Sequence, residues 1–274
     1  VLMKDNFKEW IGKEISRSDI ITPRLVDHLK KTLEPNILAN DEIPEGLFLC
    51  LCPDVVNSNN LSKDGNSKLG IFLPNLPYKI RMWAGGKFEI YDQFKIGFEI
   101  NKVSKIENIE FKKGKSGNLC FVTINHDYKL ENKIIVKEKQ TAVYRERINK
   151  NLIINKNFES IKVIDEFNIF GSSTLLFRYS ALTFNGHKIH YDIDYTKTEE
   201  GHSGLLVHAP LQATYLLNIA KKNNIKFNSF EYRATFPLIS NKTFKVQLGK
   251  NNKNEIVGLV LNHENILTMK AIFK

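Results

Sequence analysis

The segment "PLQATYLLNIAKK" (210–222) decides the fold, because it predicts a helix with almost no polar surface. Pro210 suits the N1 position, where no N–H is needed, and Lys221 and Lys222 fall in the last turn, where cations favour the helix dipole. Apolar side chains cover most of the other positions: Leu211, Ala213, Tyr215, Leu216, Leu217, Ile219 and Ala220. Such a helix must be buried on almost every side, so other elements have to wrap around it.

The segments around this helix predict what wraps around it. Upstream, "SIKVIDEF" predicts a short strand that leads into "STLLFRYSALTFN" (173–185). Downstream, runs rich in β-branched and aromatic residues predict four strands, at 230–238, 243–250, 255–264 and 266–273. Antiparallel strands that follow one buried helix predict a sheet curled around that helix.

The first half of the chain repeats this plan. "TPRLVDHLKKTLE" (22–34) predicts a helix with Thr22 as N-cap and Pro23 at N1. A long irregular segment, punctuated by prolines, follows from about residue 35 to residue 81. Strand-like runs come next, at 86–92, 98–112, 118–130 and 133–146. We therefore expect two domains of one plan, residues 1–150 and 151–274, each a sheet around a helix.

Alternation within the strands predicts which side chains face inward. In the run 133–146, Val136, Glu138 and Gln140 alternate with Lys137 and Lys139. Half of each such strand is expected to face water.

The composition predicts an ordinary globular protein. Hydrophobic residues make up 42% and charged residues 26% of the 274 positions. Cys50, Cys52 and Cys120 have neither a disulfide framework nor metal-ligand spacing, so we expect buried thiols in a reducing compartment. The sequence shows no signal peptide and no apolar run of about 18 residues. We expect a soluble cytoplasmic protein with no membrane partner.

The formal charge of +10 does not by itself identify a partner. The excess is spread along the chain, and its densest cluster, "FKKGKSGN" (111–118), is best explained as a hairpin tip. No nucleic-acid-binding motif accompanies it, so we expect no nucleic-acid partner. A basic surface also suits a ligand that carries phosphate.

The stretch "FNGHKIHYD" (184–192) holds the strongest chemical signal, and three interpretations of it are open. His187 and His190 could bind a metal, act as acid or base, or belong to a polar loop. Two histidines at i and i+3 without further ligands form a weak metal pattern, so we expect no metal. Asp192 could orient His190 or be a surface carboxylate.

The two segments "RYSALTFNGHKIHYD" (178–192) and "EEGHSGLLVHAPLQATYLL" (199–217) resemble the C-terminal domain of the MaoC-like, double hot-dog acyl-CoA hydratases and dehydratases. The similar branch is the hydroxyacyl-thioester dehydratase type 2 and mesaconyl-C4-CoA hydratase group. "WIGKEI" and residues 70–100 resemble its N-terminal domain, so the resemblance spans nearly the whole chain. It implies an α+β double hot-dog fold, in which two antiparallel sheets each wrap around a central helix.

The resemblance also implies catalytic roles. Related (R)-specific hydratases carry an aspartate and a histidine that hold the water, and the matching positions here are Asn185 and His190. Asn185 cannot titrate, so it can only orient the water or the substrate. The amide of Ala209, near the start of the buried helix, is expected to stabilise the thioester oxygen. His208 is expected to support this turn.

The resemblance extends to residues around the substrate. We expect His187, His208, Arg81, Trp83 and Gly86 to belong to the substrate site. His187 could contact the substrate or support residues that do, and an ordinary structural role stays open for Arg81, Trp83 and Gly86. Arg178 could meet a substrate carboxylate or a CoA phosphate, or be an ordinary exposed or salt-bridged helix residue.

These observations predict a hydro-lyase that adds water to an α,β-unsaturated acyl-CoA thioester, with no cofactor besides the CoA of the substrate. A non-catalytic acyl-thioester binding protein and a hot-dog thioesterase are the alternatives. The acyl group stays open between a dicarboxylyl and a fatty enoyl group. We also expect a homodimer.

Overall fold

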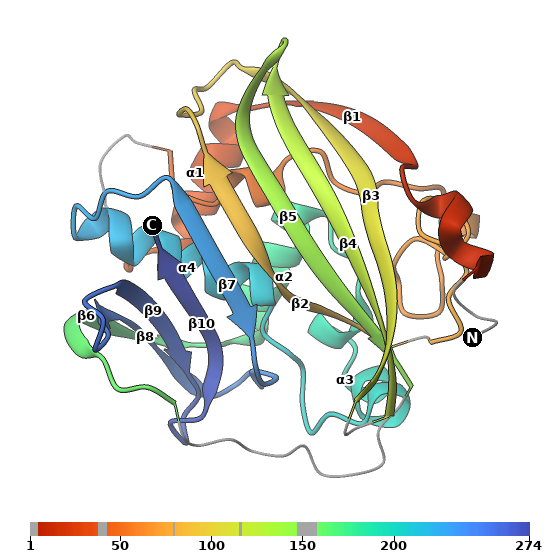
Figure 1. The fold of residues 1–274 in the computed structure, drawn as a ribbon. Helices are drawn as coiled ribbons and strands as arrows, with labels where there is room; N and C mark the ends of the chain where they lie inside the picture. The colour runs from red at the N-terminus through yellow and green to blue at the C-terminus, as the bar shows by residue number, and fades with distance from the viewer. Residues whose placement is uncertain (1–4, 38–42, 79, 115–116, 147–157) are drawn as a thin grey trace.

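The computed structural model describes residues 5–37, 43–78, 80–114, 117–146 and 158–274 (Figure 1). Ten strands form one sheet in the order β1-β3-β4-β5-β2-β7-β10-β9-β8-β6, and all neighbours are antiparallel. The first half contributes β1 (Glu14–Ile20), β2 (Ile80–Ile90), β3 (Glu99–Gly114), β4 (Gly117–Leu130) and β5 (Lys133–Arg145). The second half contributes β6 (Lys162–Phe170), β7 (Ser229–Ala234), β8 (Thr243–Lys250), β9 (Ile256–Leu261) and β10 (Leu267–Phe273).

The order of the strands shows that the two halves repeat one plan. In each half the first strand lies at the outer edge and the second strand lies at the centre of the joint sheet. The halves meet where β2 pairs with β7, with Phe88 opposite Phe230. The predicted pairing of the halves through their sheets is therefore confirmed. The predicted domain boundary between residues 150 and 151 lies outside the described residues and stays a prediction.

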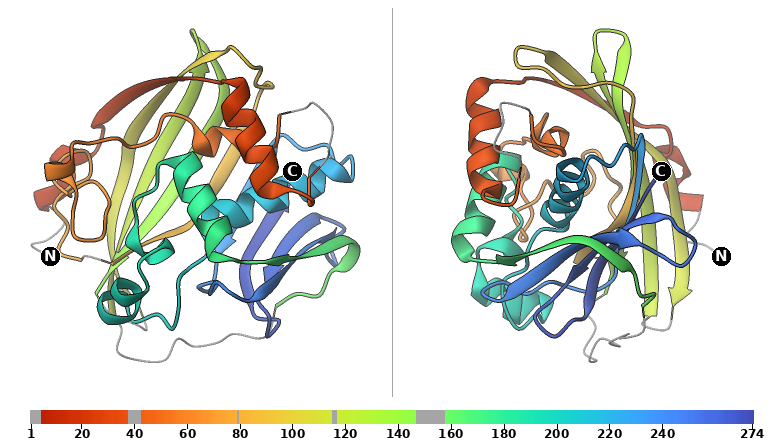
Figure 2. Two further views of the ribbon diagram at one scale, coloured as in Figure 1. Left: turned by 180° about the vertical axis from the view of Figure 1, so that it is seen from behind. Right: turned by 90° about the vertical axis from the view of Figure 1, so that its left-hand side faces the viewer.

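Helices and short turns of helix cover the concave face of the sheet (Figure 2). The α-helices are α1 (Pro23–Leu33), α2 (Ser173–Thr183), α3 (Ile193–Tyr195) and α4 (Ala209–Lys222). The shorter elements are η1 (Asp5–Trp10), η2 (Leu47–Cys50), η3 (Ser58–Asn60), η4 (Lys188–His190) and η5 (Thr196–Glu200).

Helix α4 is the buried helix that the sequence predicts. All residues from 211 to 220 are buried, and the helix packs on β8, β9 and β10 of its own half. Its start differs by one residue from the prediction, because His208 is the N-cap and Ala209 is N1. Pro210 therefore sits at N2, where its missing N–H is equally harmless.

Helix α1 forms where predicted, with the hydroxyl of Thr22 accepting from the amide of Leu25, but it does not play the part of α4. Its main helical neighbour is α2, which occupies the same place in the second half, directly after the first strand. The expectation that the first sheet wraps around helix 22–34 is thus wrong. The reason is physical: α1 is apolar along one stripe only, whereas an enclosed helix needs apolar residues all round.

In the first half, η2 lies against the sheet where α4 lies in the second half (Figure 2). Phe48 of η2 packs on Phe88 of β2 and Tyr128 of β4, with ring centroids 4.9 and 5.5 Å apart. Helix α4 holds the adjoining segment, because the side-chain amide of Asn218 bonds both the N–H and the C=O of Glu45. A single short turn replaces a whole helix, and this substitution leaves space beneath the first-half sheet.

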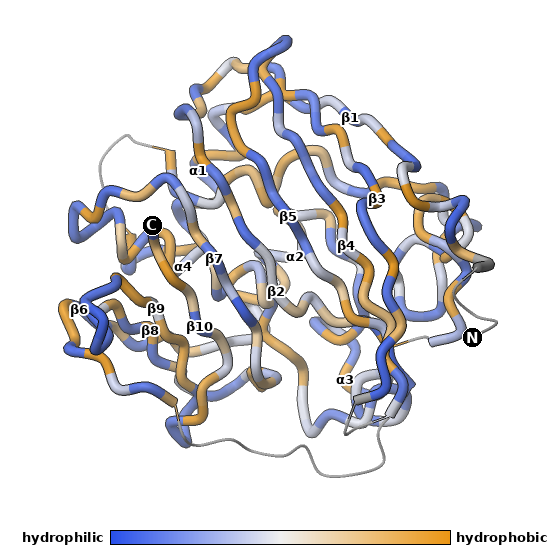
Figure 3. Tube along the Cα trace, in the orientation of Figure 1, coloured by the Kyte–Doolittle hydropathy of each residue, from blue (hydrophilic) through white to orange (hydrophobic). Residues whose placement is uncertain are grey.

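The strands confirm the sequence pattern in most places. Polar and apolar residues alternate along β3, β4 and β5 (Figure 3). Val136 and Glu138 are buried while Lys139 is exposed, as the alternation predicts. Strand β1 was not predicted as a strand. No helix among the described residues is long and apolar enough to span a membrane.

Candidate active site

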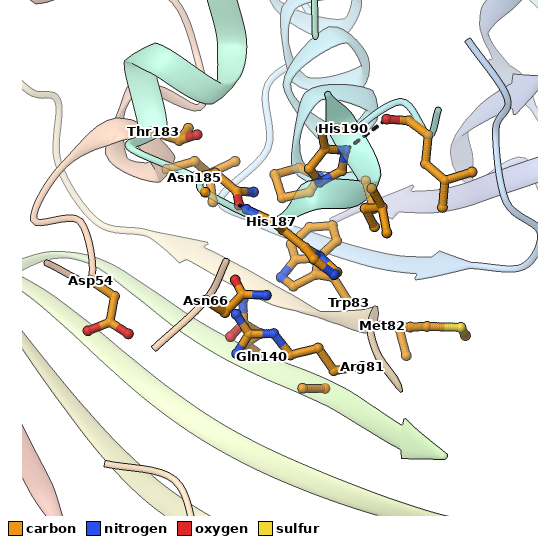
Figure 4. A pocket seen from close by; sticks show the side chains of 18 of the residues that line it. Asp54, Asn66, Arg81, Met82, Trp83, Gln140, Thr183, Asn185, His187 and His190 are labelled. Atoms are coloured by element: carbon orange, nitrogen blue, oxygen red, sulfur yellow. Dashed lines mark hydrogen bonds between the residues drawn. The ribbon is translucent and has the colours of Figure 1, made fainter. Parts of the chain in front are cut away.

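A large cavity of about 1700 Å³ lies between the two halves (Figure 4). Residues of both halves line it, including β2 and β5 from the first and the α2–α4 segment from the second. Six of the nine site residues predicted from the sequence contact this cavity or form its wall: His190, Asn185, Ala209, His187, Arg81 and Trp83.

The end of α2 brings the two-histidine loop to the cavity. Phe184 takes a left-handed conformation (φ 49°) at the C-cap, which turns the chain sharply out of the helix. The Oδ1 atom of Asn185 then accepts the amide of His187 at 2.9 Å. With its oxygen engaged, Asn185 keeps its Nδ2 hydrogens for the cavity, since no described residue accepts from them.

His190 is held as a neutral base. Its Nδ1 lies 2.8 Å from the carbonyl oxygen of Leu206, and because a carbonyl only accepts, Nδ1 carries the proton. Nε2 therefore carries a lone pair that is free to accept a proton. Burial lowers the pKa of His190 to about 3, with a smaller contribution from nearby His187 and an opposing one from the Leu206 bond. His190 is 7% exposed, so little of its surface besides Nε2 can face the cavity.

His208 lies behind His190 and outside the cavity. The two imidazole rings stack with centroids 3.5 Å apart and an angle of 16°. His208 is fully buried, and its Nε2 lies 2.8 Å from the hydroxyl of Ser180 on α2. Burial and then the neighbouring His190 and His187 hold the pKa of His208 well below its ordinary value. His208 thus fixes the plane of the His190 ring, which agrees with a supporting role.

The amide of Ala209 is available for a ligand. Ala209 is the first residue of α4 and lines the cavity. Its N–H belongs to the helix end that has no internal acceptor, and no described group accepts from it. The N-terminus of a 14-residue helix adds partial positive charge at this point.

His187 joins the two halves. Its Nε2 lies 3.3 Å from Glu200 and 3.8 Å from Asp64, a residue of the first half. Asp64 belongs to the loop 62–67, whose Gly65 packs so closely on Gly186 that a side chain there would collide with the Gly186 carbonyl oxygen. Burial favours a raised pKa for Asp64, but Arg81 and bonds from Ser62 and Asn66 outweigh it and lower the pKa.

Sequence reasoning missed this loop, because 62–67 lies in the segment described only as irregular. The available signal was the turn sequence "SKDGNS", which places polar side chains and glycine together. Asn66 and Gly65 line the cavity beside the histidine loop.

Arg81 and Trp83 form the wall supplied by β2. Figure 4 draws Arg81 across the cavity from His187 and His190. Arg81 makes no ion pair within 4.0 Å in the described part of the chain, although its charge lowers the pKa of Asp64. Trp83 stacks on Tyr232 of β7 at 4.2 Å, and its indole N–H is buried without a partner.

Two other predicted residues lie away from the cavity. Arg178 is exposed on α2 and donates to the carbonyl of Lys31 on α1, so it connects two helices. Gly86 packs under Tyr232, where a side chain would collide with the ring and with the carbonyl of Lys139. Asp192 caps α3 by accepting from the amide of Tyr195, rather than orienting His190.

Further polar residues in the cavity were not predicted as site residues. Arg145 and Glu200 are buried beside the histidine loop. A second group of polar side chains, on β3, β4 and β5, lines the cavity along the first-half sheet. The described residues contain no group of three or more His, Cys, Asp or Glu side chains arranged to hold a metal ion.

The fold and site define a class of protein that other chains share. A MaoC-like dehydratase from Phytophthora capsici has a similar structure (TM-score 0.70, 12% identity, 96% of this chain and 95% of that one). A conserved hypothetical protein from Mycobacterium tuberculosis, described as having a double hotdog fold, matches with a TM-score of 0.57 at 10% identity over 96% of both chains. These likenesses confirm the double hot-dog fold.

Sequence comparison shows the family. The model of hydroxyacyl-thioester dehydratase type 2 matches residues 46–240. The mesaconyl-C(4)-CoA hydratase of Chloroflexus aurantiacus is 35% identical over 257 residues, which is 90% of either chain. The chain belongs to the hydroxyacyl-thioester dehydratase type 2 family and is a hydratase or dehydratase of acyl thioesters.

Proposed function

We propose that the protein reversibly adds water to an α,β-unsaturated acyl-CoA thioester, with His190 as the single general acid/base. The observation that carries this proposal is the neutral His190 with a free Nε2 beside the amide of Ala209. The reaction needs no cofactor beyond the CoA of the substrate.

Water activation falls to His190 and Asn185. Neutral Nε2 takes a proton from the water, while the free Nδ2 hydrogens of Asn185 bond its oxygen and hold it in place. Asn185 cannot ionise, so no second base takes part. The imidazolium that forms then returns its proton to Cα of the thioester.

The Ala209 amide stabilises the developing enolate. Charge grows on the thioester oxygen as water adds to Cβ, and a helix N-terminal N–H is suited to bind it. The stacked His208 keeps the His190 ring in one orientation, so the base and the oxyanion donor stay in register.

Arg81 is suited to an acyl group that carries a carboxylate close to the double bond. In a mesaconyl-type thioester the carboxylate sits on the carbon that receives water, so its counter-ion must lie near His190. Arg81 faces that loop, and no described carboxylate lies within ion-pair distance of it, although its charge lowers the pKa of Asp64 (Figure 4). The relative from Chloroflexus aurantiacus is named for such a substrate, which makes this acyl class the first to test.

The edge of the cavity is suited to the CoA portion. Exposed Phe177, Phe184 and Tyr191 line it on one side, and exposed Arg233 lines it on another. Aromatic faces suit the pantetheine and adenine groups, and Arg233 suits a phosphate.

We also propose a homodimer, which light scattering tests.

The experiment is a wild-type assay with crotonyl-CoA and mesaconyl-C4-CoA. Loss of the conjugated-thioester absorbance, with a product heavier by one water and no free thiol, is expected. Release of free thiol would indicate a thioesterase instead. Binding without turnover would indicate a non-catalytic binding protein.

A further inference from the structure

The cavity extends from His190 along the inner face of the first-half sheet, into the space left where η2 replaces a helix. Six polar side chains line it there, and we call them the polar chamber: Lys102, Ser104, His126, Tyr128, Glu138 and Gln140. None of them has a part in the proposed hydration step.

Strand register places these six residues together. Ser104 lies opposite His126, which lies opposite Glu138, and Lys102 lies opposite Tyr128. Ala142, which is opposite Trp83, lies four residues after Glu138 on β5. At a strand rise of roughly 3.3 Å per residue, the row is about 13 Å from the Trp83 level. Ala142 and Ile124 line the apolar stretch between them.

One hydrogen-bond chain in the chamber ends in free donors. The Ser104 hydroxyl lies 2.7 Å from Nδ1 of His126, and Nε2 of His126 lies 3.4 Å from Oε1 of Gln140. An amide oxygen only accepts, so Nε2 carries the proton and Nδ1 accepts from Ser104. The side-chain amide hydrogens of Gln140 remain, and no described residue accepts them.

Two charged groups in the chamber are close but not paired. Among the described residues, the Lys102 ammonium bonds the carbonyl of Leu51 at 3.4 Å and lies 5.6 Å from the centre of the Tyr128 ring. Glu138 is 2% exposed and accepts from Tyr128 through one oxygen, while its Oε1 is buried without a partner. No contact within 4.0 Å joins Lys102 to Glu138. Burial lowers the pKa of Lys102 and raises the pKa of Glu138 to about 7, against the opposing effect of each charge on the other.

These groups do not fit a purely apolar occupant. Each buried polar group left without a partner costs about 1–3 kcal/mol, and a charged group costs more. A hydrocarbon tail would leave the Lys102 ammonium, the Gln140 amide and the Glu138 oxygen unpaired. A group with several acceptor atoms and negative charge satisfies all three, since Glu138 in its neutral form donates.

We propose that the polar chamber binds a carboxylate at the far end of the acyl chain, so that the enzyme accepts α,β-unsaturated thioesters of longer dicarboxylic acids. This inference rests on the proposed function and names a further substrate class for the same site. The carboxylate pairs with Lys102, accepts a hydrogen bond from the side-chain amide of Gln140 and accepts another from the O–H of neutral Glu138. The apolar stretch at Ala142 and Ile124 contacts the intervening methylene groups.

The test measures kcat/KM for two series (ladders) of 2-enoyl-CoA esters with acyl chains of four to ten carbons. One series carries a terminal carboxylate and the other does not. We expect a length at which the carboxylated ester has a kcat/KM at least about tenfold above its plain counterpart, mainly through KM. Lys102→Met should remove that advantage by lowering kcat/KM for the carboxylated ester, and it should leave the plain ester unchanged or improve it, because no unpaired ammonium then faces the chain. The control is Lys105→Met, on the outer face of the same strand, where Lys105 pairs with Glu14 at the surface.

Each outcome decides a separate point. Plain esters favoured at every length, or an equal loss on both ladders in Lys102→Met, would overturn the inference while the hydration of crotonyl-CoA stood. If no thioester is hydrated at all, the proposed function fails instead. Thermal melting checks that Lys102→Met folds; if it does not, the wild-type ladders alone decide.

Discussion

The two halves of the molecule share a strand plan and differ in what they enclose. The second-half sheet packs on helix α4, which is buried from residue 211 to residue 220 and whose first residue, Ala209, lines the cavity. The first-half sheet has only the short η2 and encloses open space with polar walls. Repetition of a fold thus allows one copy to supply reactive groups and the other to supply room for the substrate.

Two of the histidines that line the cavity, His190 and His126, show the difference between the halves most clearly. Burial lowers the pKa of both His190 and His126 to about 3, so both are neutral bases near pH 7. Of these two, His190 belongs to the half that carries Asn185 and the N-terminus of α4, which we propose to orient the water and to stabilise the thioester oxygen. In the proposed mechanism the environment of each ring, rather than its pKa, therefore assigns acid/base catalysis to His190 and recognition to His126.

Replacing these two histidines should have the largest and most unequal effect. His190→Ala removes the acid/base group, so turnover of crotonyl-CoA should fall by about a hundred- to ten-thousand-fold with a modest change in KM. His126→Ala should stay within about tenfold, because a four-carbon chain does not reach the polar chamber. Steady-state kinetics on folded variants measure both. Comparable losses of turnover in the two variants would contradict the proposal that only the second half supplies the acid/base group.

Removal of one backbone donor comes next. Proline is tolerated in the first turn of a helix, so Ala209→Pro should keep the fold while deleting the proposed oxyanion donor. We expect kcat to fall by roughly a hundred- to a thousandfold. Ala209→Ser, which keeps the N–H, is the control and should stay within about tenfold. A proline variant as active as the serine variant would show that this amide does not bear the charge.

The effect at Asn185 should be smaller, because its contribution is positional. Asn185→Ala should reduce kcat by roughly ten- to a hundredfold. Asn185→Asp keeps the shape but turns the donor amide into an acceptor, so comparison of the two variants measures the value of the N–H donors. Full activity in Asn185→Ala would remove the water-positioning role and leave His190 acting alone.

The smallest predicted effect is on stability. The pKa values of His126, His190 and His208 are all lowered in the folded protein, so the unfolded state binds more protons below the ordinary value of about 6.5. The free energy of unfolding that these neutral histidines contribute is fully present above that pH. It is lost as the pH falls toward their pKa values in the folded protein. Between pH 7 and pH 6 each histidine should cost about 0.7 kcal/mol.

Urea unfolding at the two pH values measures this loss. His126→Gln, which cannot titrate, should lose about 0.7 kcal/mol less than the wild type over the same interval. An identical pH dependence in both proteins would show that His126 ionises freely when folded.

The same contrast between the halves explains what the sequence could predict. The helix α4 and the inward face of β5 follow from local patterns, which depend only on neighbours in the chain. The predicted role of α1 was wrong, because a single apolar stripe along a helix indicates that one side is covered but does not show which element covers it. The 62–67 loop and the stack of His208 on His190 depend on residues far apart in the chain, which no local pattern reports.

The predicted site shows the same limit. Asn185, His190 and Ala209 were predicted together because a motif carries them within 25 positions. Arg178 lies in that motif too, yet the helix turns it toward α1 and away from the cavity. A motif fixes spacing along the chain, whereas the direction of a side chain depends on how the helix packs.

The central claim is that one imidazole in the second half delivers both the water and the proton. Hydration of crotonyl-CoA in deuterated water tests it most directly, because a single base on one side of the substrate must add both groups to the same face. The relative configuration of the deuterium at Cα and the hydroxyl at Cβ is read by proton NMR of the product. The account predicts syn addition with one deuterium at Cα; anti addition would require a second acid on the opposite face and would contradict it.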